Sequence, residues 1–190
     1  RVLTLSQVAH VIRQTPVEIE VFGFGSLCVM VEGRCALSSY ATGRSPNNAG
    51  VCSPAESVRW EEKGRQVDAR LGGVLIDRYG PEEHRAYPTL CKGRFEVEGR
   101  REHALEEPTS LNTLDVLPEL IRAGVKAIKI EGRQRSAAYI DQVTRVWRQA
   151  IDRAVADLAA YAPSPAEQQA LQRLSEGRQT TLGALSRPWQ

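Results

Sequence analysis

The sequence lacks a surplus of charge of either sign. Its 190 residues include 25 Lys and Arg against 23 Asp and Glu, for a net charge of +2. Proteins that bind nucleic acid normally gather basic side chains against the phosphates, so this composition predicts no nucleic-acid partner. No apolar run approaches the roughly 18 residues of a membrane-spanning helix, and the first residues show no signal peptide. We therefore expect a cytoplasmic protein.

The sequence also lacks a CxxC pair, although it contains four cysteines, Cys28, Cys35, Cys52 and Cys91. Structural zinc sites usually take two ligands from one tight turn, so these wide spacings argue against zinc. A reducing cytoplasm disfavours disulfides. An inert buried thiol is the simplest interpretation of a single cysteine. Four of them in the first half of the chain, in glycine-rich sequence, indicate a metal site instead.

Glycines lie close to three of the cysteines in the sequence: Gly25, Gly33 and Gly50 are each within three residues of one. Glycine lets the backbone approach a cluster closely, so that its N–H groups can bond to the sulfides. Arg34 and Lys92, each adjacent to a cysteine, could offset the negative charge of four thiolates. For either residue alone, a solvated side chain is the simpler interpretation.

A hydrolytic triad is not recognisable. The histidines, His10, His84 and His103, lie in charged or helical sequence without the Ser or Cys pairing of a hydrolase. We interpret all three as surface residues, and the sequence therefore offers little support for a peptidase.

Helical and extended patterns alternate along the chain, which predicts the α/β class. We expect helices at 3–14, 110–123, 136–158 and 166–174, strands at 17–22 and 125–130, and a long loop at 40–56. Residues 57–99 give mixed signals. The predicted organisation is one part over residues 1–160, which includes the cysteine loops at 28–91, and a short helix and tail over 161–190. Because the first residues already form a helix without an initiator Met, we expect the chain to begin within a fold.

Residues 20–38 match the pattern E-x-F-x-x-G-[SA]-[LM]-C-x4-G-x-C-x-[LI]-S at all its fixed positions. This motif resembles the signature of the collagenase-like peptidase family. Further similarities are Arg-Ser-Pro-Asn at 44–47, before Cys52, and Ile-Glu-Gly-Arg at 130–133. The resemblance implies the C-terminal half of a (β/α) barrel-like fold with cysteine-bearing loops, a fragment that lacks the early strands.

Within that family, residues 22–25, 91–94 and 106–112 resemble the UbiU-type branch. The resemblance implies a [4Fe-4S] cluster bound by the four cysteines and a heterodimer with a UbiV-like protein. It implies oxygen-independent hydroxylation of a ubiquinone precursor, with prephenate as hydroxyl donor. Other branches modify RNA, so a prephenate-dependent RNA hydroxylation protein is the alternative. A peptidase is a second alternative.

Two charged residues follow the strand predicted at 125–130, namely Glu131 and Arg133. Residues at the C-terminal ends of barrel strands tend to line active sites. Arg133 could bind a carboxylate such as that of prephenate through its two-pronged guanidinium group. A structural ion pair between Glu131 and Arg133 is an equal alternative. No catalytic residue can be identified from the sequence.

Overall fold

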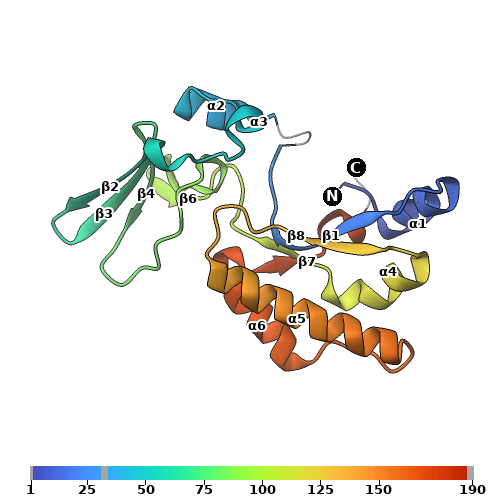
Figure 1. The fold of residues 1–190 in the computed structure, drawn as a ribbon. Coiled ribbons are helices and arrows are strands. Elements are labelled where there is room, and N and C mark those ends of the chain that lie inside the picture. Colours follow the sequence, from blue (N-terminus) through green and yellow to red (C-terminus); the bar gives the residue numbers. More distant parts are fainter. Residues whose placement is uncertain (1, 31–33, 188–190) are drawn as a thin grey trace. The chain divides into compact units, whose positions relative to one another are not determined.

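The chain folds into two units in the computed structural model, which describes residues 2–30 and 34–187 (Figure 1). Unit 1 comprises residues 1–27 and 109–190, and unit 2 comprises residues 28–108. The sequence places a boundary near residue 160 instead. That position lies inside unit 1, because helix α6 after it packs against helix α5 before it.

Unit 1 is a mixed four-stranded sheet with helices. The sheet has the order β8-β1-β7-β9, in which β1 is parallel to β8 and antiparallel to β7. Its elements are α1 (Leu5–Gln14), β1 (Glu20–Ser26), β7 (Ser110–Asn112), η3 (Leu114–Val116), α4 (Leu117–Ala123), β8 (Ala127–Ile130), α5 (Ala137–Ala156), α6 (Pro165–Leu174), η4 (Glu176–Arg178), β9 (Thr180–Thr181) and η5 (Gly183–Leu185), where η denotes a 3-10 helix.

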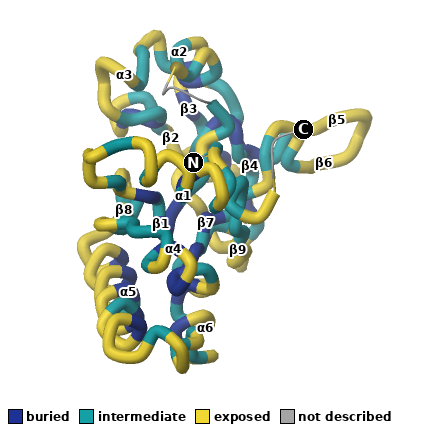
Figure 2. The backbone as a smooth tube through the Cα atoms, turned by 90° about the vertical axis from the view of Figure 1, so that its right-hand side faces the viewer, coloured by how far each residue is buried: buried dark blue, intermediate teal, exposed yellow. Residues whose placement is uncertain are grey.

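Local signals explain where the helices of unit 1 begin and end. The side chains of Thr4 and Ser136 accept backbone N–H bonds at the starts of α1 and α5, and Gly124 ends α4 in the left-handed conformation. Helix α5 buries one stripe, including Val143 and Trp147, against Phe24 of β1. The opposite side of α5 stays exposed (Figure 2). This stripe belongs to one of two buried clusters among the described residues of unit 1, and the other joins Val8, Val21 and Leu120.

Unit 2 is built on an antiparallel sheet of order β2-β3-β4, with a separate hairpin of β5 and β6. A two-glycine turn, Gly72 and Gly73, joins β3 to β4 with positive φ at both residues. Leu71 and Ile76 of this sheet pack with Ala41 of α2. The elements are α2 (Ala36–Thr42), α3 (Pro46–Ala49), η1 (Ala55–Ser57), β2 (Val58–Lys63), β3 (Gln66–Leu71), β4 (Val74–Tyr79), η2 (Leu90–Lys92), β5 (Phe95–Val97) and β6 (Arg100–Glu102).

The predicted helices at 3–14, 136–158 and 166–174 are confirmed to within a few residues. Two predictions need correction. The loop expected at 40–56 contains the end of α2 and the whole of α3, and the helix expected at 110–123 begins only at Leu117, after β7 and η3. Leu111 is buried in strand β7 and Leu114 in the 3-10 helix η3, so their spacing resembled the apolar spacing of an α-helix.

The described strands form open sheets, so the (β/α) barrel-like fold stays a prediction. Across residues 2–30 and 34–187, every helix is too short or too polar to cross a bilayer.

Candidate metal centre

All four cysteines belong to unit 2 and are free thiols. Cys28 is exposed, Cys35 and Cys52 are half-buried, and Cys91 is buried in η2. The thiols therefore come from separate segments of unit 2, in keeping with their wide spacing in the sequence. Gly33 lies outside the described residues, and Gly50 ends helix α3 in the left-handed conformation.

Ser38 links the segments that carry Cys35 and Cys52. Its backbone N–H donates to Cys35 Sγ at 3.3 Å, so the thiol caps helix α2. Its hydroxyl donates to the Cys52 carbonyl oxygen at 2.6 Å, and the residue is 2% exposed. One buried serine thus orients both cysteine segments.

Tyr87 links the segments of Cys52 and Cys91. The Tyr87 hydroxyl donates to the carbonyl oxygen of Ser53, next to Cys52, at 3.0 Å. Leu90, next to Cys91, packs with Ala41 of helix α2. The sequence identified neither Ser38 nor Tyr87 as part of the site, because their partners are backbone carbonyls distant in the chain. The family motif ends on Ser38, so the motif was the one sequence feature that could have identified this residue as part of the site.

The thiols influence one another electrostatically. Burial raises the pKa of Cys91 to about 12, Lys92 opposes this, and negative charge on Cys52, Cys28 and Cys35 adds to it. Burial also raises the pKa of Cys52, with contributions from Cys35 and Cys28. Cys91 therefore responds to charge on the other three thiols, and Cys52 to charge on Cys35 and Cys28. Cys52 and Cys91 are neutral thiols at pH 7 unless a cationic centre draws off their protons.

Four thiols are a ligand set that iron-sulfur clusters use, and the cluster stays a prediction for this chain. Among residues 2–30 and 34–187, no three His, Cys, Asp or Glu side chains are gathered tightly enough to surround one metal ion. A cubane of four irons is wider than one ion, and each thiolate binds a different corner of it.

The structure places Glu131 and Arg133 in unit 1, after β8, and does not pair their side chains. The Glu131 carboxylate accepts the backbone N–H groups of Ser26 at 3.3 Å and of Arg133 at 2.8 Å. It therefore holds the ends of β1 and β8 together. The Arg133 side chain is exposed and forms no ion pair within the described residues. The alternative of a structural ion pair between the two is wrong.

Arg135 is the arginine that the structure fixes in this part of unit 1. It donates to Ser26 Oγ and to Glu176 Oε1, both at 2.7 Å, and lies 5.3 Å above the ring of Tyr139. The sequence does not reveal its role, because Glu176 lies 41 residues later in the chain. Its guanidinium group is already engaged by these partners.

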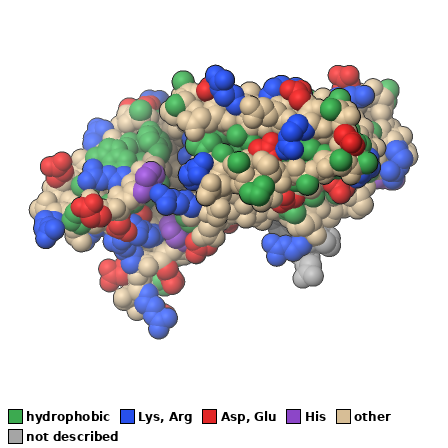
Figure 3. Space-filling model, turned by 90° about the horizontal axis from the view of Figure 1, so that it is seen from below, with side chains coloured by type: hydrophobic (Ala, Val, Ile, Leu, Met, Phe, Trp, Pro, Cys, Tyr) green, Lys and Arg blue, Asp and Glu red, His purple; other side chains and the backbone are tan. Residues whose placement is uncertain are grey.

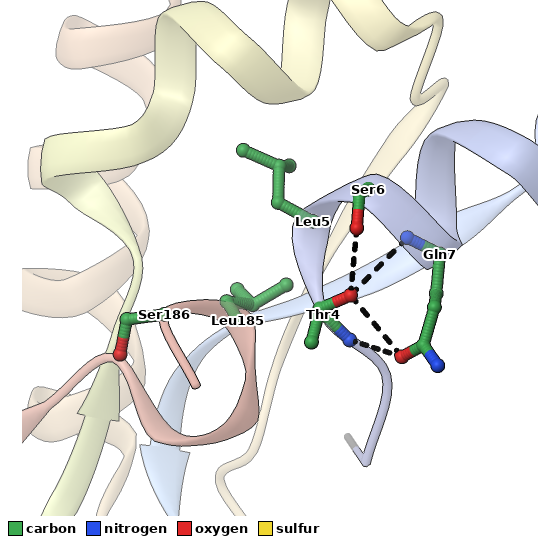
Figure 4. A pocket seen from close by; sticks show the side chains of 6 residues that line it. All are labelled: Thr4, Leu5, Ser6, Gln7, Leu185 and Ser186. Carbon is green, nitrogen blue, oxygen red and sulfur yellow. Dashed lines mark hydrogen bonds between the residues drawn. The ribbon is translucent and has the colours of Figure 1, made fainter. Parts of the chain in front are cut away.

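A shallow pocket lies in unit 1 between the start of α1 and the segment near residue 185 (Figure 4). Its polar groups are used in capping: Thr4 N–H donates to Gln7 Oε1 at 2.8 Å, and Gln7 N–H donates to Thr4 Oγ1 at 3.3 Å. We therefore assign no ligand to it.

Comparison with known proteins shows the family. The model of peptidase family U32 matches residues 1–187. The chain is 34% identical to tRNA hydroxylation protein P of Escherichia coli over 82% of this chain and 38% of that protein. It is 32% identical to tRNA hydroxylation protein P1 of Bacillus subtilis over 74% of this chain and 28% of that protein. No solved structure matches it.

A third relative is the 23S rRNA 5-hydroxycytidine C2501 synthase of Escherichia coli, at 32% identity over 80% of this chain and 19% of that protein. The chain thus spans well under half of these relatives. Their names refer to tRNA or rRNA, which overturns the expectation of no nucleic-acid partner. The prediction rested on net charge, which is a poor guide to nucleic-acid binding here. Basic and acidic side chains are interspersed on the surface (Figure 3). Local basic groups can contact phosphates without a net surplus of positive charge.

The collagenase-like family predicted from the motif is therefore confirmed, whereas the UbiU-type branch within it stays a prediction. The chain belongs to peptidase family U32.

Proposed function

We propose that this chain is part of an RNA hydroxylation protein in which Cys28, Cys35, Cys52 and Cys91 hold a [4Fe-4S] cluster. The observation that carries the proposal is that all four thiols belong to unit 2, where Ser38 and Tyr87 connect the segments of Cys35, Cys52 and Cys91. The names of the relatives favour RNA over a ubiquinone precursor as the substrate. A bound cluster would supply one-electron transfer.

The proposed reaction replaces a ring C–H bond of the RNA by C–OH. In it, the C–OH bond of prephenate breaks, and prephenate loses this hydroxyl, at the oxidation level of hydroxide, together with CO2 to leave phenylpyruvate. The hydroxyl forms the new C–O bond, the proton of the broken C–H bond leaves to solvent, and the two electrons pass singly to an oxidising one-electron carrier. Arg133, which is exposed and unpaired within the described residues, is the candidate group for a prephenate carboxylate. Glu131 supports the turn on which Arg133 stands.

The first test is anaerobic reconstitution with iron and sulfide, followed by quantitation of both per chain. We expect about four irons and four sulfides, lost in Cys28→Ala, Cys35→Ala, Cys52→Ala and Cys91→Ala. Ser39→Ala is the control, because Ser39 lies on helix α2 without binding a cysteine segment through its side chain. Iron that persists in all four cysteine variants would rule out this ligand set.

The second test identifies the substrate. The reconstituted protein is incubated anaerobically with prephenate, an electron acceptor, and either unhydroxylated tRNA, unhydroxylated rRNA or a ubiquinone precursor. Mass spectrometry of the products then detects a gain of one oxygen. We expect it in an RNA nucleoside and only with prephenate present. Hydroxylation of the quinone precursor alone would restore the ubiquinone interpretation.

A further inference from the structure

The backbone of the Cys91 segment lies directly against strand β4. Leu90 is 9% exposed and packs with Ile76 of β4. Beyond the cysteine, a Cβ atom added at Gly93 would lie 2.6 Å from the Ile76 carbonyl oxygen, so only glycine permits this approach. Leu90, before Cys91, and Gly93, after it, thus both lie against strand β4.

Arg94 secures the end of this segment through a largely buried ion pair. Its Nε lies 2.9 and 2.8 Å from the two carboxylate oxygens of Asp77, and its Nη1 lies 2.7 Å from Glu83 Oε1. The side chains of Arg94 and Asp77 are only 21% and 6% exposed. Removing one partner from such a pair leaves a buried charge uncompensated, which is strongly destabilising locally.

His103 provides a second anchor. Its Nδ1–H donates to the carbonyl oxygen of Lys92, the residue after Cys91, at 3.0 Å. The sequence predicts a surface histidine at this position, but the residue is half-buried because it reaches this carbonyl group. The peptide that follows Cys91 is therefore fixed from two directions.

We propose that Arg94, held by Asp77 and Glu83, is a positioning residue that keeps Cys91 where the fourth thiolate of the cluster is required. The inference rests on the proposed function, since it concerns a ligand of the proposed cluster. Only Lys92 and Gly93 separate Arg94 from Cys91, and Gly93 lies against β4, so displacement of Arg94 moves the thiol. Groups that orient metal ligands commonly govern how well the metal is retained.

A matched control exists in the same sheet. Arg78 of β4 forms an equally close pair with Asp68 of β3, with Nε–Oδ1 and Nη2–Oδ2 distances of 2.6 and 3.0 Å. Asp68 is 0% exposed. Arg78 is 13 residues before Cys91 and does not belong to its segment. Arg78→Gln therefore reports the effect of removing an arginine from a buried aspartate elsewhere in unit 2, where Lys63 and Arg70 remain 3.2 and 3.7 Å from Asp68.

The first experiment uses the metal-free, reduced chain and measures alkylation of each cysteine by iodoacetamide with mass spectrometry. Exposed Cys28 reports intrinsic reactivity. In Arg94→Gln we expect Cys91 to react about tenfold faster relative to Cys28, because local opening becomes easier. Arg94→Lys, which keeps the charge but loses the two-pronged contact, should give a smaller increase. Arg78→Gln should leave the ratio within about twofold.

The second experiment measures iron release from the reconstituted chain to a chelator, which we expect to be about tenfold faster in Arg94→Gln than in Arg78→Gln. If the unsubstituted chain binds no iron, the proposed function fails, while the alkylation ratio still decides the positioning role. If that ratio is the same in Arg94→Gln, Arg78→Gln and the unsubstituted chain, the positioning role of Arg94 is wrong.

Discussion

At Ser38 a single buried hydroxyl connects two cysteine segments, so its removal has a predictable cost. Ser38→Ala leaves the Cys52 carbonyl without its 2.6 Å donor. We expect a loss of about 1–3 kcal/mol in the free energy of unfolding, measured with urea. The control is Ser39→Ala, which should be near neutral. Equal stabilities for the two variants would contradict the linking role of Ser38.

Glu83 makes stability depend on pH. The Arg94 guanidinium and the Gly80 N–H lower the pKa of its carboxyl group from 4.5 to about 2. The folded state therefore holds this proton more weakly than the unfolded chain, so the stabilisation is complete above pH 4.5 and is lost as the pH falls towards 2. Urea unfolding at pH 6 and pH 3 should show a smaller difference for Glu83→Gln than for the unsubstituted chain. Glu82→Gln, at an exposed neighbour, should preserve the full difference.

The turn between β3 and β4 shows how elements of unit 2 contact each other. Gly72 and Gly73 both have positive φ, +57° and +86°, but a Cβ at Gly72 would overlap the Ala41 carbonyl of α2, whereas Gly73 faces open space. Gly73→Ala should cost about 1 kcal/mol of unfolding free energy from its backbone conformation alone. Gly72→Ala should cost at least about 2 kcal/mol more, because α2 must move.

Urea unfolding of both variants measures this difference. Similar losses of unfolding free energy in the two variants would show that α2 moves away from the turn at little cost. Cys35 caps α2, so the same displacement should weaken iron retention in Gly72→Ala more than in Gly73→Ala.

Elements with local signals were predictable from the sequence, and those stabilised by distant partners were not. Helix α6 begins with Ser164 and a reciprocal bond from Glu167, a pattern visible in the sequence. Strands β3 and β4 gave mixed signals because each buries an aspartate, Asp68 and Asp77. Arg78 and Arg94 neutralise these two buried carboxylates. That pairing is visible only once the fold is known, so the sequence alone does not show that the aspartates are buried.

At the scale of the whole molecule, the cysteines and the proposed cluster belong to one unit. Binding to the folded state stabilises it by mass action. Hydrogen exchange of the reconstituted chain should therefore slow by about tenfold or more in the core of residues 28–108, and much less in residues 1–27 and 109–190. A chain with all four cysteines changed to Ala should show no difference. Equal slowing of hydrogen exchange in both units would show that cluster binding stabilises unit 1 as much as unit 2.

The sequence by itself determined the α/β class, the helices with clear caps, the four thiols and the family motif, because these depend on residue types and short spacings. Only the tertiary structure decided that residues 28–108 form a separate unit, that Ser38 and Tyr87 connect the cysteine segments, and that Arg94 anchors the segment of Cys91. Each of these contacts joins residues at least 14 positions apart. Folding alone determines which distant donor reaches which acceptor.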